Sequence, residues 1–411
     1  MEKILMKILL ISQHFYPEDF KCNDVAFELV RRGHEVTVLA GIPNYPLGKF
    51  FDGYGLFTKR VEMLNGVKVI RSAVVPRGKG GAIRLALNYF SFAFSASVRA
   101  LFISVRHKYD IILVHETSPV TVGIPAVLVK KLVGIPLYFW VLDLWPESLS
   151  AAGGINNKYI LGFFNGITKW IYRNSTRILI SSKGFEQSIL EKGDFTNKLV
   201  YFPNWADKVL LNKNEYPLPL LPEGFRVMFA GNMGEAQDFD HLMETACLLR
   251  EEKDIHFLLV GDGRKRPWVE QFIKDNELQE TVHWLGRHPL EAMPSFFEKA
   301  DVMLVSLKDN LIFNLTVPAK VQAYMSAAKP IVSMMNGEGA RIIEEAQCGF
   351  STNAGNAMEL AKLIREAYGM EKNALRRLGE NGCQFCWQHF DFSRRMNHLC
   401  EMMGENNNSN N

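Results

Sequence analysis

The feature that most constrains this chain is an alternation of short apolar runs with segments of helical spacing. The first apolar run spans residues 7–11, a helical segment follows at 24–32, and a second run spans 35–39. Together these form a β-α-β unit of about 30 residues. Because the alternation continues along the chain, it predicts parallel sheets that are covered by helices on both faces.

The alternation occurs in both halves of the chain, on either side of a proline-rich stretch at 216–224 (YPLPLLPEG). That stretch is stiff and cannot form a central strand. Asn23 or Asp24 is expected to cap the first helix, and Gly33 to end it. Further strands are expected at 68–71, 111–114, 137–141, 177–180 and 199–201, and then at 225–230, 255–260, 282–284, 302–305 and 330–333.

With 411 residues, the chain exceeds what one hydrophobic core usually holds. The sequence therefore predicts an α/β protein of two doubly wound, Rossmann-like domains facing across a cleft, where ligands bind beyond the carboxyl ends of the strands. The expected divisions are an N-terminal domain at 1–207, a linker at 208–224, a C-terminal domain at 225–385, a helix at 386–403 packing back on the N-terminal domain, and a disordered tail at 404–411.

Charge and cysteine content narrow the cellular setting. The net charge of +3 is too small to favour nucleic acid as a partner. Six scattered cysteines and the lack of a secretory segment before the first strand predict free thiols in the cytoplasm. Cys383 and Cys386 have CxxC spacing but lack a second ligand pair, so helix packing is favoured over a metal or redox role.

The most apolar stretch lies at 85–98, and its length of about 14 residues is less than the roughly 20 that a membrane span needs. Basic residues flank it on both sides within 77–108. A buried helix of the first domain is the favoured interpretation. A basic, aromatic-rich helix in a membrane interface is the alternative, and the two can combine.

Two glycine loops follow strands in the second half. In 229–237 (FAGNMGEAQ), glycines allow backbone N–H groups to approach a ligand, and the next helix offers its positive end to phosphate. A tight strand-to-helix turn is the alternative. The second loop, 260–266 (VGDGRKR), carries three cations, at least two of which are expected to be surface charges.

Charged residues near other predicted strand ends complete the candidates. Lys308 follows a strand, and Lys320 lies near a helix start, where the dipole disfavours a cation unless an anion binds there. Asp143 and Glu147 are candidate acid/base groups or helix caps. The Asp238-Phe-Asp240 string is expected to cap a helix and not to bind a metal.

These segments resemble glycosyltransferase family 4, which has the two-domain GT-B architecture, and within it the L-fucosamine transferases of O-antigen and capsule assembly. The resemblance spans nearly the whole chain in the expected order. The segments that carry it are 16–20 (YPEDF), 23–38 (NDVAFELVRRGHEVTV), 41–46 (GIPNYP), 143–148 (DLWPES), 230–237 (AGNMGEAQ), 260–263 (VGDG), 285–289 (LGRHP) and 317–325 (VPAKVQAYM).

The resemblance implies a UDP-sugar held by the second domain and an acceptor entering along the first, through the loops at 19–24 and 43–49. The implied catalytic residues are Asp143, Glu147 and Lys320, and the implied acceptor-side residues are Asn23 and Asp24. The implied donor-binding residues are Gly231, Asn232, Met233, Gly234, Gln237, Gly263, Arg264, Arg287, Lys308, Thr316 and Val317. No bound metal or other cofactor is expected.

The chain departs from the family pattern in two places. Where many relatives carry two glutamates eight positions apart, it has Leu315 and Ala323. Many relatives carry an arginine and a lysine after the first glycine loop, whereas this chain has Met233 and Gln237 or their neighbours in that region. Lys308 and Lys320 are the candidates to replace the missing contacts.

The expected reaction is a retaining transfer of a sugar, such as the N-acetylated deoxyhexose L-fucosamine, to a lipid-linked glycan of O-antigen, capsule or exopolysaccharide. The protein is then expected in the cytoplasm, peripheral at the inner face of the plasma membrane. Two alternatives stay open. One is an NDP-sugar 2-epimerase of the same architecture, and the other is a non-catalytic nucleotide-sugar-binding protein.

Overall fold

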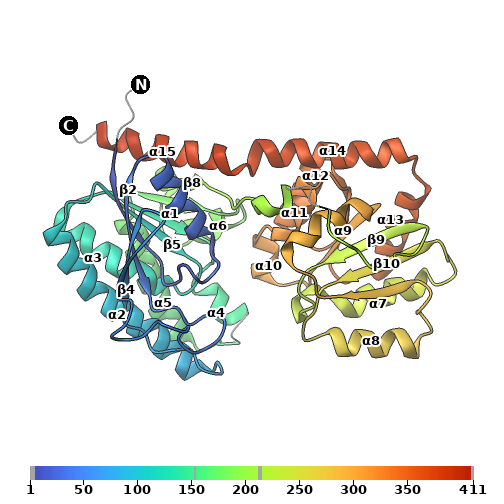
Figure 1. Ribbon diagram of the computed structural model, residues 1–411, viewed down its shortest axis with the longest axis horizontal. Helices are drawn as coiled ribbons and strands as arrows, with labels where there is room; N and C mark the ends of the chain where they lie inside the picture. The colour runs from blue at the N-terminus through green and yellow to red at the C-terminus, as the bar shows by residue number, and fades with distance from the viewer. Residues whose placement is uncertain (1–4, 152–153, 212–214, 409–411) are drawn as a thin grey trace. The chain divides into compact units, whose positions relative to one another are not determined.

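The computed structural model describes residues 5–151, 154–211 and 215–408. The chain forms two compact units (Figure 1). Unit 1 contains the described residues up to Phe202 together with those from Ser393 onward, and unit 2 is Pro203–Phe392.

Unit 1 is built on an eight-stranded sheet with the order β3-β4-β2-β1-β5-β6-β7-β8. Every pairing is parallel except that of the edge strand β3 with β4. Its strands are β1 (Lys7–Ile11), β2 (Glu35–Gly41), β3 (Val61–Leu64), β4 (Val67–Ser72), β5 (Ile111–Glu116), β6 (Leu137–Val141), β7 (Arg177–Ile180) and β8 (Leu199–Tyr201).

Helices cover both faces of this sheet. In Figure 1, α2, α3 and α5 lie on one side of it, and α1 and α15 lie on the other. The helices are α1 (Lys21–Arg31), α2 (Ala82–Arg106), α3 (Gly123–Val133), α4 (Glu147–Ala151), α5 (Lys158–Asn174), α6 (Phe185–Leu190) and α15 (Phe392–Asn408). The Tyr138 hydroxyl of β6 donates to the Met402 carbonyl of α15 at 2.6 Å, which ties the end of the chain to this sheet.

Unit 2 has a six-stranded parallel sheet with the order β11-β10-β9-β12-β13-β14. Its strands are β9 (Phe225–Ala230), β10 (Ile255–Val260), β11 (Val282–Gly286), β12 (Val302–Ser306), β13 (Ile331–Met334) and β14 (Gly349–Thr352). Its helices are α7 (Phe239–Leu248), α8 (Arg266–Asp275), α9 (Met293–Lys299), α10 (Leu311–Leu315), α11 (Ala319–Ser326), α12 (Glu338–Glu345), α13 (Ala357–Gly369) and α14 (Lys372–His389).

Two apolar clusters hold unit 2 together, one on each face of its sheet. Helices α7, α8 and α13 pack on one face, and α9, α11 and α12 pack on the other. The proline-rich stretch belongs to this unit, since Tyr216, Leu218 and Leu221 pack against the second cluster. Residues 212–214 of the predicted linker lie outside the described residues.

The doubly wound, two-domain architecture is confirmed, but several local predictions are wrong. Helix α1 begins at Lys21, and its N-cap, Phe20, makes no side-chain capping bond, so neither Asn23 nor Asp24 is the cap. The predicted disordered tail is helical as far as Asn408, because α15 continues through it, and 409–411 lie outside the described residues.

Helix α2 is also longer than the apolar run that predicted it, with 25 residues against the expected 14 or so. Among the described residues, it is the one helix whose length and composition would allow it to cross a membrane. One face of it packs on the unit 1 sheet, because Phe92, Ala96 and Ala100 are fully buried.

Candidate functional site

Two glycine turns meet at the carboxyl edge of the unit 2 sheet. Gly231 follows β9 with φ +138°, and Gly261 follows β10 with φ +145°, a backbone region that favours glycine. A Cβ placed on Gly261 would lie 1.9 Å from the Gly231 carbonyl oxygen. Only glycine allows the two loops to pack backbone against backbone there.

Part of the first loop is occupied by this packing. The Gly231 N–H donates to the Val260 carbonyl, and the Met233 N–H donates to the Asp262 carbonyl, both at 2.8 Å. The Met233 side chain is fully buried. These two predicted donor-binding residues therefore hold the turn in shape, and their N–H groups are used within unit 2.

The acidic string that opens α7 does not cap the helix through its first residue. Asp238 has φ +47° and makes no side-chain capping bond, and its carboxylate contacts His241 Nδ1 at 2.9 Å. The left-handed backbone at Asp238 accounts for this, so the predicted capping role is wrong. The Asp240 carboxylate instead binds the ammonium groups of Lys265 and Lys308, at 3.0 and 3.3 Å. In the described ranges, no group of three or more His, Cys, Asp or Glu residues could hold a metal ion.

A pocket of about 730 Å³ opens beside the two glycine turns. It is lined by Gly231, Asn232, Val260, Gly261, Asp262, Gly263, Arg264, Arg287, His288 and Met293. Both arginines are exposed, and neither has an ion-pair partner among the described residues. Their neighbours Lys265 and Arg266 are paired with Asp240 and Asp262. The wall of the pocket therefore carries two uncompensated positive charges.

Lys320 lies directly against the first glycine turn. A Cβ on Gly231 would be 2.7 Å from its Cε, and its ammonium lies 3.9 Å from the centre of the Phe229 ring. The ammonium donates to Gln237 Oε1, so these two predicted residues are in contact. Burial lowers the pKa of Lys320 to about 7.

The remaining predicted donor residues on this edge are engaged locally. The Thr316 hydroxyl donates to the Ile312 carbonyl at 2.7 Å, and Val317 packs against the core. Lys308 is paired with Asp240 and Glu235, both of which it shares with Lys265. Of the side chains predicted to meet a donor, Arg264 and Arg287 keep their charge free, and Lys320 lies in a desolvated position.

In unit 1, the two predicted carboxylates lie in different surroundings. Asp143 follows β6, accepts a hydrogen bond from the Ser148 hydroxyl, and its pKa is raised by burial. Glu147 begins α4, where it binds Lys192 and accepts from the Ser188 hydroxyl at 2.7 Å. Asp143 therefore has no ion-pair partner among the described residues, while Glu147 forms an ion pair with Lys192 within unit 1.

Glu116, at the end of β5, is a titratable neighbour of Asp143. Burial and the nearby Asp143 raise the pKa of Glu116 well above the usual 4.5, because both disfavour its charged form. Its Oε2 accepts the Asp143 N–H at 3.3 Å, and its Oε1 has no hydrogen-bond partner in the part of the chain that the structure describes. The adjacent His115 is also buried, and this lowers its pKa to about 3.

The predicted acceptor-side residues begin a second polar group. Asn23 is buried, donates to the Glu18 carbonyl at 2.7 Å, and accepts the Tyr16 N–H at 3.0 Å. It thus shapes the loop before α1. Asp24, in the first turn of α1, is only partly buried.

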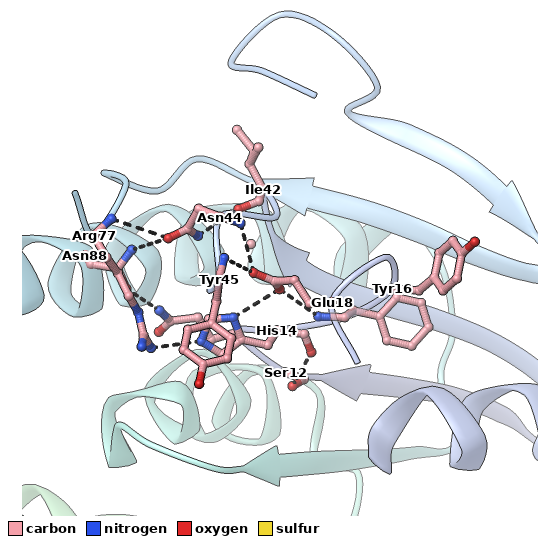
Figure 2. Close-up of polar contacts among 12 residues, drawn as sticks. Ser12, His14, Tyr16, Glu18, Ile42, Asn44, Tyr45, Arg77 and Asn88 are labelled. Carbon is pink, nitrogen blue, oxygen red and sulfur yellow. Dashed lines mark hydrogen bonds and ion pairs between the residues drawn. The ribbon is translucent and has the colours of Figure 1, made fainter. Parts of the chain in front are cut away.

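Glu18 joins the two loops that were predicted to receive an acceptor (Figure 2). Its Oε1 accepts the N–H groups of Asn44 and Tyr45 at 2.9 and 2.7 Å. Its Oε2 contacts His14 Nδ1 at 3.0 Å. The side chain is fully buried, so these bonds compensate a charge that has been removed from water.

Arg77 completes this network from a distant part of the chain. Its Nη2 lies 3.0 Å from His14 Nε2. A guanidinium only donates, so Nε2 accepts, and the ring hydrogen is on Nδ1, where it donates to Glu18. His14 lies three positions after the end of β1 and four positions before Glu18, a spacing that could have indicated the pair from the sequence.

Comparison with known proteins decides what these two units are. Residues 22–205 match the family described as "Glycosyl transferase 4-like domain", and residues 224–369 match "Glycosyl transferases group 1". The chain is a family 4 glycosyltransferase.

Two relatives of this chain are also named as glycosyltransferases. It is 28% identical over 304 residues to the probable glycosyltransferase WbjE of Pseudomonas aeruginosa, covering 71% of this chain and 73% of the relative. It is 24% identical over 321 residues to WcaI of Escherichia coli K12, a putative colanic acid biosynthesis glycosyl transferase, covering 74% and 77%.

Solved structures share the GT-B fold of this glycosyltransferase. Sucrose-phosphate synthase from Thermosynechococcus elongatus superposes with a TM-score of 0.72 at 14% identity, over 98% of this chain and 100% of that one. HepE of Anabaena, solved in complex with UDP, gives a TM-score of 0.67 at 14% identity, over 97% and 100%.

Proposed function

We propose that this glycosyltransferase binds a UDP-sugar in the unit 2 pocket and transfers the sugar, with retention of configuration, to a hydroxyl of a lipid-linked glycan. The observation that carries the proposal is the pocket beside Gly231, with Arg264 and Arg287 unpaired in its wall and Lys320 against the turn. Unpaired cations next to a glycine turn suit a diphosphate. Anabaena HepE, of the same fold, was solved with UDP and with UDP-glucose, which supports the choice of nucleotide.

The charges of the pocket suit the chemistry of the leaving group. As the sugar departs, the diphosphate gains negative charge, and cations already fixed beside it stabilise that charge without reorganisation. In the proposed retaining mechanism, the leaving phosphate accepts the proton of the acceptor hydroxyl. Asp143 then orients the donor sugar and does not act as a strong base.

The acceptor is proposed to meet unit 1 at the loops that Glu18 joins, near Asn23 and Asp24. A lipid-linked acceptor would place the protein at the inner face of the plasma membrane. The name of WcaI, a putative colanic acid biosynthesis glycosyl transferase, favours assembly of a bacterial surface polysaccharide, whether O-antigen, capsule or exopolysaccharide. The resemblance to L-fucosamine transferases makes an N-acetylated deoxyhexose the first donor sugar to test.

Calorimetry and product analysis test the proposal together. We expect UDP to bind the wild type, and the double variant R264A/R287A to bind it at least tenfold more weakly. The control is R376A, an exposed arginine on α14. Incubation with UDP-sugars and lipid-linked acceptors should give a product with the donor's anomeric configuration.

Three results would contradict this proposal. Equal UDP affinity of the wild type and the double variant would remove the pocket from donor binding. Epimer formation from a UDP-sugar alone would indicate a 2-epimerase. UDP binding without turnover on any lipid-linked acceptor would indicate a non-catalytic nucleotide-sugar-binding protein.

A further inference from the structure

Helix α2 exposes bulky apolar side chains that a helix on a soluble domain usually turns to the core. Its inner face is built mostly of small residues, among them Ala93, Ala96 and Ala100, together with Phe92 and Ile103. Its large apolar side chains point to solvent at helical spacing, at Ile83, Leu87, Phe90, Phe94, Val98, Phe102 and Val105. Phe94 is 75% exposed, which is far from the burial expected of a core residue.

The exposed apolar surface continues onto the two helices beside α2. On α5, Tyr159, Ile160 and Phe163 are exposed, and on α3 Leu132 and Val133 are exposed. The Phe90 ring lies 6.4 Å from that of Phe163, which joins α2 to α5. Twelve of the 28 exposed large apolar residues in the described ranges lie on these three helices. We call this surface the α2–α3–α5 face, and Figure 1 shows its helices on one side of the unit 1 sheet.

The charge of this face is of one sign. None of the three helices contains an aspartate or a glutamate. Their basic residues are Arg84, Arg99 and Arg106 on α2, Lys130 and Lys131 on α3, and Lys158, Lys169 and Arg173 on α5. The whole chain, by contrast, is nearly balanced, with 47 basic and 44 acidic residues. Several of the cations lie over aromatic rings, as Arg106 does over Phe102 at 3.7 Å.

Helix α2 is held flat against unit 1. Asn88, in its inner face, is fully buried, accepts from Gln13 Nε2 at 2.7 Å, and donates to the Val75 carbonyl at 2.6 Å. Inserting α2 across a bilayer would break these bonds and uncover the sheet beneath it. The helix can instead meet a membrane side-on, with its apolar ridge among the acyl chains and its cations at the headgroups.

We propose that the α2–α3–α5 face docks on an anionic lipid bilayer, with α2 lying in the plane of the headgroups. The exposed aromatic and aliphatic side chains match the acyl chains of a bilayer, and the cations match its anionic headgroups. Protein interfaces, by contrast, are depleted in lysine. This inference extends the proposed lipid-linked acceptor, but docking is measurable without donor or acceptor.

The same helix touches the network around Glu18. Asn88 Nδ2 donates to Asn44 Oδ1 at 3.4 Å, and Arg77, which precedes α2, donates its backbone N–H to the same oxygen at 3.4 Å. Asn44 is in turn held by Glu18. The docked face is therefore joined by hydrogen bonds to the loop proposed to receive the acceptor (Figure 2).

Vesicle flotation of the full chain tests this proposal. We expect the wild type to bind vesicles of phosphatidylcholine with about one third phosphatidylglycerol at least tenfold more tightly than pure phosphatidylcholine, at low salt. R84E/R106E should lower that affinity roughly tenfold or more. F94S/V98S should lose the binding that remains at high salt. The matched controls are K274E on α8 and M358S on α13, both exposed and in unit 2.

The outcomes separate this proposal from its rivals and from the proposed function. The proposal is overturned if either α2 variant binds the anionic vesicles as tightly as the wild type does. It is also overturned if the wild type does not bind these vesicles at low salt. If the wild type self-associates in size-exclusion chromatography, F94S/V98S is monomeric, and neither floats with vesicles, the face joins two copies of the chain and the lipid proposal is wrong. UDP binding is measured on the same proteins. If a protein floats with the vesicles but does not bind UDP, the result contradicts the donor pocket and leaves the docking proposal standing.

Discussion

The two units present sheets of the same kind, yet their carboxyl edges hold charge in opposite ways. In unit 1, the buried carboxylate of Glu18 is surrounded by donors from within the unit, including His14 and two backbone N–H groups. In unit 2, Arg264 and Arg287 have no ion-pair partner among the described residues, and Lys320 is desolvated. The Glu18 carboxylate has its hydrogen-bond donors within unit 1. The free arginines of unit 2 would gain a counter-charge if an anion bound there.

The largest expected effect tests whether the unit 1 edge is a bonded network. Glu18→Ala leaves His14 and the N–H groups of Asn44 and Tyr45 without an acceptor, and should lower the free energy of unfolding by about 3–5 kcal/mol. Urea denaturation measures it. The exposed Glu186→Ala is the control, with an expected change under about 0.5 kcal/mol. Equal stability of the two variants would show that Glu18 does not organise this edge.

At the unit 2 edge, one substitution should change activity and stability in opposite directions. Lys320→Met removes a cation beside the leaving diphosphate, so turnover should fall about 10²–10³-fold. The pKa of Lys320 is lowered to about 7, so below pH 7 the folded protein carries a desolvated charge at a cost that the variant lacks. The ligand-free variant should therefore be more stable by at least about 1 kcal/mol at pH 6.

Activity assays and thermal unfolding measure the two effects of Lys320→Met. Lys274→Met, at an exposed position on α8, is the control. Turnover near that of the wild type would remove Lys320 from the mechanism. A less stable ligand-free variant would show that its desolvation does not cost folding free energy.

The pH dependence of UDP binding should reveal the same lysine. In the free protein, Lys320 loses its proton as the pH rises through about 7, whereas a bound diphosphate favours the charged form. Affinity should be constant below pH 7 and fall above it, by up to about tenfold per pH unit, with proton uptake on binding. Calorimetry in buffers of different ionisation enthalpy measures that uptake. A wild-type profile that matches Lys320→Met would contradict the assignment.

The smallest effect separates free cations from paired ones. Arg264→Ala should weaken UDP binding about fivefold, near 1 kcal/mol, with no change in stability, because the side chain is exposed and unpaired. Arg266→Ala, two positions away, removes a cation that is already paired with Asp262 and should leave UDP affinity nearly unchanged. If both variants lose affinity equally, the pairing does not decide which cation binds.

Much of the fold was predictable because strands buried on both faces of a parallel sheet read as continuous apolar runs, as in β1 and β6. The missed strands lack that signature. Strand β3 alternates exposed and half-buried residues at the antiparallel edge, and β14 (GFST) contains little apolar surface. The exposed bulky face of α2 was also hidden, since apolar residues alone do not tell which side of a helix faces the core.

The candidate site was predictable only in outline. Glycines after strands marked the turns at Gly231 and Gly261, because the requirement for a missing Cβ is local. The sequence could not show which cations stay free of acidic partners. Lys265, for example, is paired with Asp240, 25 positions away in the chain. The pairing of His14 with Arg77 joins residues 63 positions apart, a contact that only the tertiary fold specifies.

The position of α15 has a consequence for how the protein is made. This last helix supplies Met396, Leu399 and Met403 to the interior of unit 1, although the rest of that unit ends at Phe202. On the ribosome, residues up to Phe202 emerge first, yet they lack the helix that covers part of their apolar surface until unit 2 has also been synthesised. Emergence of α15, and not that of the first 202 residues, is the event that completes the folding of unit 1.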